Sequence, residues 1–473
     1  MGSIESATGT PRAKQVWNWR GGLTAVAISA GIGLVSTSAV YAASALSDKP
    51  KPLLSEDELP RRTAPIIEIG PDFLGTGNLP KGWVLPTGAV WQPALWVFGS
   101  SRTSYNFVEN RRGGEDLSEV ATRLDLFANL QLSGTERFLI GFSPFRSSGN
   151  FTNYQFSPNA GEGFNDHLSI EPTVAFFEGE FGELFPNLDS EDKGSYDISF
   201  AIGRQPIFFQ EGALVNDTID SLGITRDTII IPDVVIDWRL TGLIGVNDIH
   251  RADRRRHDGD LLFGVFNEIN FRGPTVNLDA ILVTSDDAPG AFAGVAMVQR
   301  FGHLNTAVRL NGSLALDEES AAVGDGLLGF VELSTTLPHG EDLVYANGFA
   351  AAGDFTPAAL DPSVGGPLGR AGVLFASPSL GRYGSALSGA TSNVAGGAVG
   401  IQLFFNKAKT QLILEAGGRY EFEDGTPNSV AIGAEVRQAI GRRVVLRGDT
   451  FYSVSEGRGG DGFGARAEIA INF

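Results

Sequence analysis

The chain has 473 residues, a formal net charge of −19 and no cysteine. The acidic balance argues against nucleic acid as a partner, because a protein that binds nucleic acid needs a basic face to neutralise phosphates. Without cysteine there is no disulfide framework, no cysteine-ligated zinc and no thiol nucleophile. The 61 glycines and a mean hydropathy near zero fit neither a helical membrane protein nor a soluble helical enzyme.

The segment 1–45 has the layout of a secretory signal peptide. A positively charged stretch ends at Arg20, an uncharged run of small apolar residues follows it, and small residues precede candidate cleavage sites after Ala42 and Ala45. A retained membrane anchor is the alternative, because the apolar run is long. A secreted chain without cysteine fits a protein of the bacterial envelope.

Residues 46–88 are rich in proline and show no sustained period. Proline at this density disrupts both helices and strand ladders. The sequence therefore predicts a periplasmic extension in this region, either folded back as a plug or present as a loose linker.

From residue 89 onward the dominant pattern is an alternation with period two, which is the period of β-strands. Between residues 120 and 132, for example, Leu124 and Leu126 alternate with Arg123 and Asp125. A soluble β-sandwich would bury the apolar face against a second sheet, whereas a membrane barrel turns it toward lipid. The runs exceed the ~5–6 residues usual in soluble strands and match the ~9–11 that cross a bilayer. They favour a membrane barrel.

The last strand is the most specific feature of the sequence. Residues 463–473 alternate between apolar and polar side chains and end on Phe473. This segment resembles the C-terminal strand of Gram-negative outer-membrane β-barrel porins. The resemblance implies an all-β, antiparallel, up-and-down transmembrane barrel in the bacterial outer membrane, surrounded by lipid and lipopolysaccharide. It also implies that the barrel-assembly machinery reads the strand that ends on Phe473.

The barrel over 89–473 is predicted to have 18 strands, and 16 is the alternative because the strand boundaries in 89–110 and 205–233 are ambiguous. Short turns such as 271–274 and 441–442 alternate with longer polar loops. In outer-membrane barrels the short turns are periplasmic and the long loops external. A barrel of either size leaves an aqueous channel unless loops fold into it.

The polar face of the alternating strands predicts the residues that line the pore. They are Arg123, Asp125, Arg239, Arg309, Glu332, Glu415, Arg419, Glu435, Arg437, Arg447, Asp449, Arg466 and Glu468. Neighbouring strands lie ~4.8 Å apart, so these side chains can form lateral ladders and neutralise one another. Alternatively, unpaired arginines project into the pore and favour anionic or hydroxyl-rich solutes.

The segment 353–394 is the longest loop and is nearly uncharged. Such a loop can fold inward as a constriction or stay outside the barrel. The segments 146–168 and 205–233 are rival constriction elements. Gly203-Arg204-Gln205, at the start of the second of these segments, and the glycine-containing loop that follows resemble the alginate-export family of 18-stranded porins. That resemblance implies an arginine-rich conduit for an anionic polysaccharide, although acidic residues are here as numerous as the lumenal arginines.

The chain shows no motif for catalysis. None of its five histidines has the HxxxH or HExxH spacing of helix-borne zinc sites. His250 and His257 lie in an arginine-rich stretch with several aspartates, and a metal site there competes with a self-neutralising solvated loop. We therefore predict no catalytic residue, no metal and no cofactor.

Three functions are consistent with these observations. The first is an outer-membrane channel for small hydrophilic solutes, including anionic ones, with an inward-folded loop as its constriction. The second is an alginate-type polysaccharide export porin. The third is a non-conducting barrel that serves as an adhesin or scaffold. The sequence does not predict the oligomeric state.

Overall fold

The computed structural model describes residues 62–473 apart from a few short gaps. The gaps are 76–79, 110–114, 158–160, 189–193, 195, 258, 339, 424 and 457–459. The predicted signal peptide, with Ala42 and Ala45, and residues 46–61 of the predicted extension lie outside the described residues. No helix in the described part has the length and hydrophobicity needed to span a membrane.

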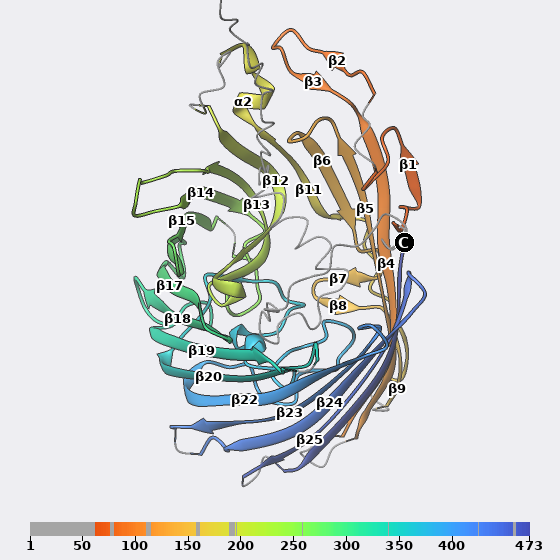
Figure 1. Ribbon diagram of the computed structural model, residues 1–473. Coiled ribbons are helices and arrows are strands. Elements are labelled where there is room, and N and C mark those ends of the chain that lie inside the picture. Colours follow the sequence, from red (N-terminus) through yellow and green to blue (C-terminus); the bar gives the residue numbers. More distant parts are fainter. Residues whose placement is uncertain are drawn as a thin grey trace, which may run out of the picture.

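The described chain forms a closed antiparallel barrel of 18 strands (Figure 1). The wall strands are, in order, β4 (Ala94–Val108), β5 (Leu117–Gln131), β6 (Arg137–Phe142), β11 (Pro172–Glu180), β12 (Ile198–Phe209), β13 (Val215–Arg226), β14 (Asp237–Asn247), β15 (Leu261–Asn270), β16 (Thr275–Thr284), β17 (Gly290–Phe301), β18 (Leu304–Ala315), β19 (Gly326–Thr336), β20 (Leu343–Asp354), β22 (Ser392–Phe405), β23 (Thr410–Glu421), β24 (Ser429–Ile440), β25 (Val444–Ser455) and β26 (Gly462–Asn472). Pairing of β26 with β4 closes the ring. The prediction of 18 strands is confirmed, and the alternative of 16 is wrong.

The third and fourth wall strands are each interrupted. β6 and the later β9 (Asn153–Ser157) both pair with β5, and β10 (Gly163–Asn165) pairs with β9 before the chain continues into β11. Between β6 and β9 the chain leaves the ladder as a small hairpin of β7 (Arg146–Ser147) and β8 (Asn150–Phe151). The third strand therefore consists of β6 and β9, and the fourth of β10 and β11, each in two pieces instead of one long run.

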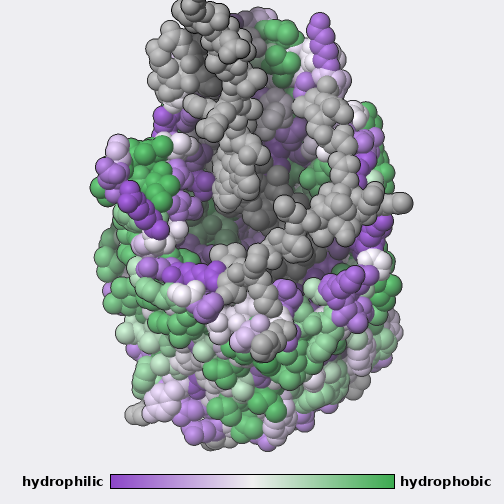
Figure 2. All heavy atoms as spheres, in the orientation of Figure 1, coloured by the Kyte–Doolittle hydropathy of each residue, from purple (hydrophilic) through white to green (hydrophobic). Residues whose placement is uncertain are grey.

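The alternation places apolar side chains outside and polar ones inside. On β18, Val308 and Leu310 are 44% and 53% exposed, whereas Arg309 and Asn311 are buried. A β-sandwich would bury the apolar pair instead. Figure 2 shows a largely hydrophobic outer surface over the lower strands and a hollow whose wall carries hydrophilic residues. The barrel is therefore apolar toward its surroundings and polar toward its lumen, as in membrane barrels.

The two ends of the barrel differ. At one end, hereafter the turn end, the connections between strands are short, as at 271–274, where the Phe271 N–H donates to the Pro274 carbonyl at 2.9 Å. This end also carries α2 (Phe181–Leu184) and η2 (Pro186–Leu188), both between β11 and β12. At the opposite end, hereafter the loop end, the connection between β20 and β22 is long and contains β21 (Ala359–Leu360) and η4 (Pro367–Arg370). At the same end, η3 (Gln210–Gly212) joins β12 to β13.

The described part of the extension is attached to the wall. β1 (Ile67–Ile69) pairs with β4 at Leu95–Val97, on the edge that β26 leaves unoccupied beyond Ser100. A second hairpin joins β2 (Trp83–Val84) to β3 (Val90–Trp91). The indole N–H of Trp96 donates to the Pro71 carbonyl at 2.9 Å. β1 is thus a short additional strand on the barrel wall.

The barrel closes where Phe473 meets Gly99. Their backbone N–H and carbonyl groups exchange hydrogen bonds of 2.8 and 2.9 Å. A Cβ atom on Gly99 would overlap the Asp125 carbonyl oxygen and lie 2.9 Å from the Phe473 ring. Gly99→Val is therefore expected to destabilise the folded barrel by about 1–3 kcal/mol, the usual cost of overpacking. The measurement is the temperature at which the folded band disappears in a heat-modifiability gel.

The matched control is Gly134→Val, since a Cβ atom at Gly134 meets no atom within 4 Å. Equal transition temperatures for the two variants would contradict the role of Gly99 in closure.

Candidate functional site

The connection 355–391, hereafter the inner loop, lies inside the barrel (Figure 1). It contributes apolar side chains to one buried cluster with the inner faces of β19, β20, β22, β24 and β25. The residues of the inner loop in this cluster are Phe355, Leu368, Ala371, Leu374, Phe375, Tyr383, Ala386 and Leu387. Leu368 is completely buried, and a cavity of only about 40 Å³ lies between residues 373–386 of the loop and the wall. The inner loop is thus packed against the wall and held by burial of its apolar residues.

A second segment, residues 205–219, also folds inward, and we call it the inner hairpin. Within the described residues, β12 pairs with β11 only as far as Arg204, and β13 pairs with β14 only from Asp220 onward. Beyond those points the two strands pair with each other, and Val215 pairs in parallel with Ala359 of β21. Leu214 and Ile219 are fully buried in a cluster with the inner faces of β14–β17. The hairpin therefore leaves the wall and narrows the lumen.

The inner hairpin and the inner loop meet at a charged junction, which we call the central junction. Arg370 of the inner loop donates to Glu211 of the inner hairpin at 2.8 Å and lies 3.2 Å from Glu332 of β19. Arg309 of β18 pairs with Glu332 and lies 3.9 Å from Glu211. The side chain of Glu211 is 44% exposed, whereas those of its three neighbours are buried. The junction has two positive and two negative groups, so its formal charge is zero.

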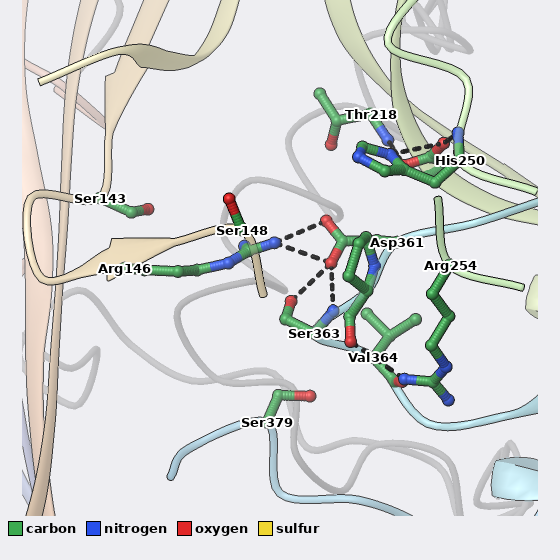
Figure 3. Close-up of polar contacts among 12 residues, drawn as sticks. Ser143, Arg146, Ser148, Thr218, His250, Arg254, Asp361, Ser363, Val364 and Ser379 are labelled. Atoms are coloured by element: carbon green, nitrogen blue, oxygen red, sulfur yellow. Dashed lines mark hydrogen bonds and ion pairs between the residues drawn. The ribbon is translucent and has the colours of Figure 1, made fainter. Parts of the chain in front are cut away.

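A second set of contacts holds the base of the inner loop (Figure 3). Arg146 of the β7–β8 hairpin donates to both carboxylate oxygens of Asp361, at 2.7 and 2.8 Å. Asp361 also accepts hydrogen bonds from the backbone N–H and the hydroxyl of Ser363. From the loop between β14 and β15, Arg254 donates to the carbonyl of Val364 at 2.9 Å. The base of the inner loop is therefore attached to two separate neighbours.

The Arg146–Asp361 pair predicts a pH response. Burial alone would raise the pKa of the Asp361 carboxyl, but the adjacent Arg146 guanidinium outweighs it and holds this pKa well below its ordinary value. Since the folded-state pKa is depressed, the pair stabilises the loop fully above the ordinary value of about 4 and stops doing so as the pH falls below it. Asp361→Asn removes this ion pair, so the inner loop should fluctuate more and the open-channel current should be noisier than in the unchanged protein. The difference in noise between the two proteins should be constant from pH 8 to 5 and shrink only below pH 4.

The control is Asp287→Asn, a substitution of an exposed residue in the connection 285–289, which should add no noise at any pH. A difference that instead vanishes between pH 7 and 5 would assign the contact to another titrating group.

Charged side chains of the wall form two rows in register across β24, β25 and β26. One row contains Glu435, Asp449 and Arg466, and the other contains Arg437, Arg447 and Glu468. Arg466 donates to Asp449 at 2.7 Å, and Arg447 lies 3.5 Å from Glu468. From β4, Arg102 donates to Glu468 at 2.8 Å. The first row carries one net negative and the second one net positive formal charge, so the two rows together sum to zero, and Arg102 adds one positive charge beside them.

This geometry has counterparts among solved structures. The barrel is similar to a BenF-like porin from Pseudomonas fluorescens Pf-5, with a TM-score of 0.53 and 11% sequence identity over 80% of this chain and 98% of that one. The chain has the porin fold. It is also similar to OccK2 (OpdF) of Pseudomonas aeruginosa and OccAB3 of Acinetobacter baumannii, each with a TM-score of 0.51 and 10% identity over 80% of this chain and 97% and 99% of theirs. No family model and no curated protein matches the sequence.

Within this porin fold, every predicted pore-lining residue is described and lies on a wall strand with its side chain buried or half-buried. Each predicted arginine has a carboxylate partner. The pairs are Arg123–Asp125, Arg239–Asp227, Arg309–Glu332, Arg419–Glu421, Arg437–Glu435, Arg447–Glu468 and Arg466–Asp449. The contacts therefore agree with the alternative in which the charged side chains neutralise one another, and not with the alternative in which unpaired arginines project into the pore.

Glu415 binds the inner loop. It accepts hydrogen bonds from the backbone N–H groups of Val373 and Leu374 at 3.0 and 2.8 Å, and from the Tyr345 hydroxyl. This carboxylate was predicted from the alternation as a pore-lining group. Its observed partners show that it positions the loop within the porin fold.

Several polar residues of the interior were missed by the sequence reasoning. The most prominent are Glu211, Asp361, Arg370 and Arg382, which belong to connecting segments without a period-two pattern. One signal could have identified three of them, because isolated charges in a nearly uncharged loop must be paired if that loop is buried.

The described residues contain no group of three or more side chains that could hold a metal ion. In the arginine-rich stretch around His250, Arg254, Arg255 and Arg256 are exposed, as in a solvated loop, but Arg251 is not. Arg251 is fully buried, and its guanidinium donates to Asp260 at 3.0 Å and to the Ala288 carbonyl at 2.9 Å. His250 itself lies 3.0 Å from the Asp217 carboxylate. These residues attach the connection 248–260 to the barrel interior.

Proposed function

We propose that this protein is an outer-membrane channel of the porin type that conducts small hydrophilic solutes, including anionic ones. The observation that carries the proposal is a closed barrel, apolar outside, whose polar lumen is narrowed by an inner loop and an inner hairpin that meet at the central junction. An 18-stranded barrel is wide enough for an aqueous path, so segments folded inward determine what passes.

Insertion in the outer membrane follows from the outward-facing residues. Large apolar side chains such as Val308 and Leu310 are exposed around the barrel, and lipid is the solvent that suits them. We infer that the signal peptide 1–45 directs export and that the strand ending on Phe473 engages the assembly machinery. The loop end then faces outward, toward lipopolysaccharide, and the turn end faces the periplasm.

The central junction supports weak rather than strong charge selectivity. Its positive and negative groups are equal in number, and each predicted arginine of the wall is paired. A neutral junction with strong local dipoles admits polar solutes of either sign at comparable cost. We therefore propose a channel for small polar solutes in which anions pass but are not strongly preferred.

The test is conductance of the purified full chain in a planar lipid bilayer. Stepwise current increases in potassium chloride, together with swelling of proteoliposomes in small sugars and amino acids, are the expected results. Swelling only with long anionic polysaccharides would favour the alginate-type exporter. The absence of current steps from correctly folded barrels would instead favour a non-conducting adhesin or scaffold.

A further inference from the structure

A polar cavity of about 220 Å³ lies apart from the central junction. Its walls come from the β7–β8 hairpin, β9, β10 with the residues after it, and the inner loop. The polar side chains that line it are Asn150, Asn153, Gln155, Asn165, His167 and Arg382. An ordered water needs only about 10–15 Å³ of such space, so the cavity has room for a solute of several heavy atoms.

The cavity is built by a connected set of hydrogen bonds. Glu119 of β5, which is fully buried, accepts from the Asn153 amide at 2.6 Å and from the Arg382 backbone N–H at 2.5 Å. The Asn165 amide donates to the Asn153 side-chain oxygen at 2.9 Å, and the Arg382 guanidinium donates to Gln155 at 2.8 Å. Four segments of the chain, β5, β9, β10 and the inner loop, therefore hold one another, which fixes the side chains around the cavity before a ligand arrives.

Two glycines allow the close approach of these segments. Gly381 has a φ of +69°, and a Cβ atom there would overlap the Glu119 carboxylate. Gly149 has a φ of +79°, and a Cβ atom there would lie 2.7 Å from the Pro362 side chain. The inner loop thus approaches β5 at Gly381 and the β7–β8 hairpin at Gly149, two positions that only glycine satisfies without strain. The cavity exists because the inner loop is in place.

The lining indicates the class of ligand. Among the described residues that line the cavity there is no carboxylate, so a cation has no counter-charge there. The positive charge of the single guanidinium, on Arg382, is balanced by the buried Glu119 carboxylate behind the lining, which accepts from the backbone N–H of the same residue, so the site has no net positive charge to select an anion. Side-chain amides and an imidazole offer both donors and acceptors, and hydroxyl groups of a solute also both donate and accept. This combination suits a neutral solute rich in hydroxyl groups.

We propose that the cavity is a binding site for an uncharged, hydroxyl-rich solute of monosaccharide size. It lies toward the loop end of the barrel, beside the inner loop. A role in transport rests on the proposed channel function, whereas binding itself does not. The binding-site proposal specifies a narrower class of solute, uncharged and hydroxyl-rich, than the proposal of a channel for small polar solutes does.

The experiment measures binding of glucose, galactose and mannose to the full chain in detergent by isothermal titration calorimetry. At least one of these sugars should bind with a stoichiometry of one. Asn165→Leu and Arg382→Met should each weaken that binding at least tenfold. The matched control is Asn277→Leu, since Asn277 is an inward-facing amide at the turn end of β16 and should leave binding unchanged.

Failure to bind any of the three sugars, or equal binding by Asn165→Leu and Asn277→Leu, would overturn the inference. Binding of acetate without binding of any sugar would also overturn it, because the site would then recognise anions. A protein that conducts ions but binds no sugar refutes the sugar site alone. A protein that binds sugar at this site but gives no current steps refutes the channel and retains the site.

Discussion

Removal of residues 367–388 from the inner loop is expected to raise the single-channel conductance several-fold. These residues include most of the apolar side chains that bind the loop to the inner wall, and without them the lumen of an 18-stranded barrel is open to water. The structure provides suitable ends for the excision, because the Cβ position of Gly366 lies 2.6 Å from the Gly389 carbonyl oxygen. Joining these glycines through a short Gly-Ser linker leaves the β20–β22 ladder intact. Planar-bilayer recording gives the conductance.

The excision exposes Leu328, Phe330 and Phe349 of the wall to the lumen. Each buried side chain of this kind contributes about 1.5–3 kcal/mol, so the folded state is checked by its heat-modifiable band. The double variant Leu368→Asp/Leu374→Asp releases the loop without shortening the chain and should also raise conductance. The control shortens the exposed stretch 316–319. Unchanged conductance in folded versions of both loop variants would refute the inner loop as the constriction.

Opposite shifts in ion selectivity are expected from Glu211→Gln and Arg370→Gln. The first leaves the central junction with one net positive charge and the second leaves it with one net negative charge. An ion that passes about 7 Å from an uncompensated charge in water experiences about 0.6 kcal/mol, which is close to the thermal energy. Because an anion gains this energy and a cation loses it, the anion-to-cation permeability ratio should rise about sevenfold in the first variant and fall by a similar factor in the second. Reversal potentials in a salt gradient give this ratio.

The control for charge alone is Glu318→Gln in the exposed connection 316–325, far in sequence from the junction. Its reversal potential should match that of the unchanged protein. Shifts of the same sign in Glu211→Gln and Arg370→Gln would show that the central junction is not on the ion path.

The barrel architecture could be predicted from the sequence because each strand has apolar surroundings on its outer face and a polar lumen on its inner face, which imposes a period of two on its residues. Val308 and Leu310 must face apolar surroundings while Arg309 must not, and that contrast is legible in every regular strand. The strand number was ambiguous because the sequence pattern does not show where strands end in 89–110 and 205–233. In the structure, β3 and β4 lie in the first of these segments, and the inner hairpin, which leaves the wall, lies in the second.

The charged interior was predictable residue by residue but not pair by pair. The alternation assigns Arg447 and Arg466 to the lumen, whereas the partner of each depends on register across strands, and no local pattern encodes that register. The inner loop adds a further difficulty. Arg370 reaches a carboxylate on η3, Glu211, far from it in sequence, and Arg382 reaches Gln155 in the same way. Contacts between two irregular segments leave no periodic trace in the sequence.

The edge of β4 beside the closure is shared by segments from opposite ends of the chain. β26 pairs with it as far as Ser100, and β1 pairs with it at Leu95–Val97. An affinity tag fused after Phe473 would run along β4 into the place that β1 occupies, and the two would compete for the same hydrogen bonds. A tag inserted in the exposed stretch 316–319 avoids that competition, so versions labelled there retain the pairing of both β1 and β26 with β4.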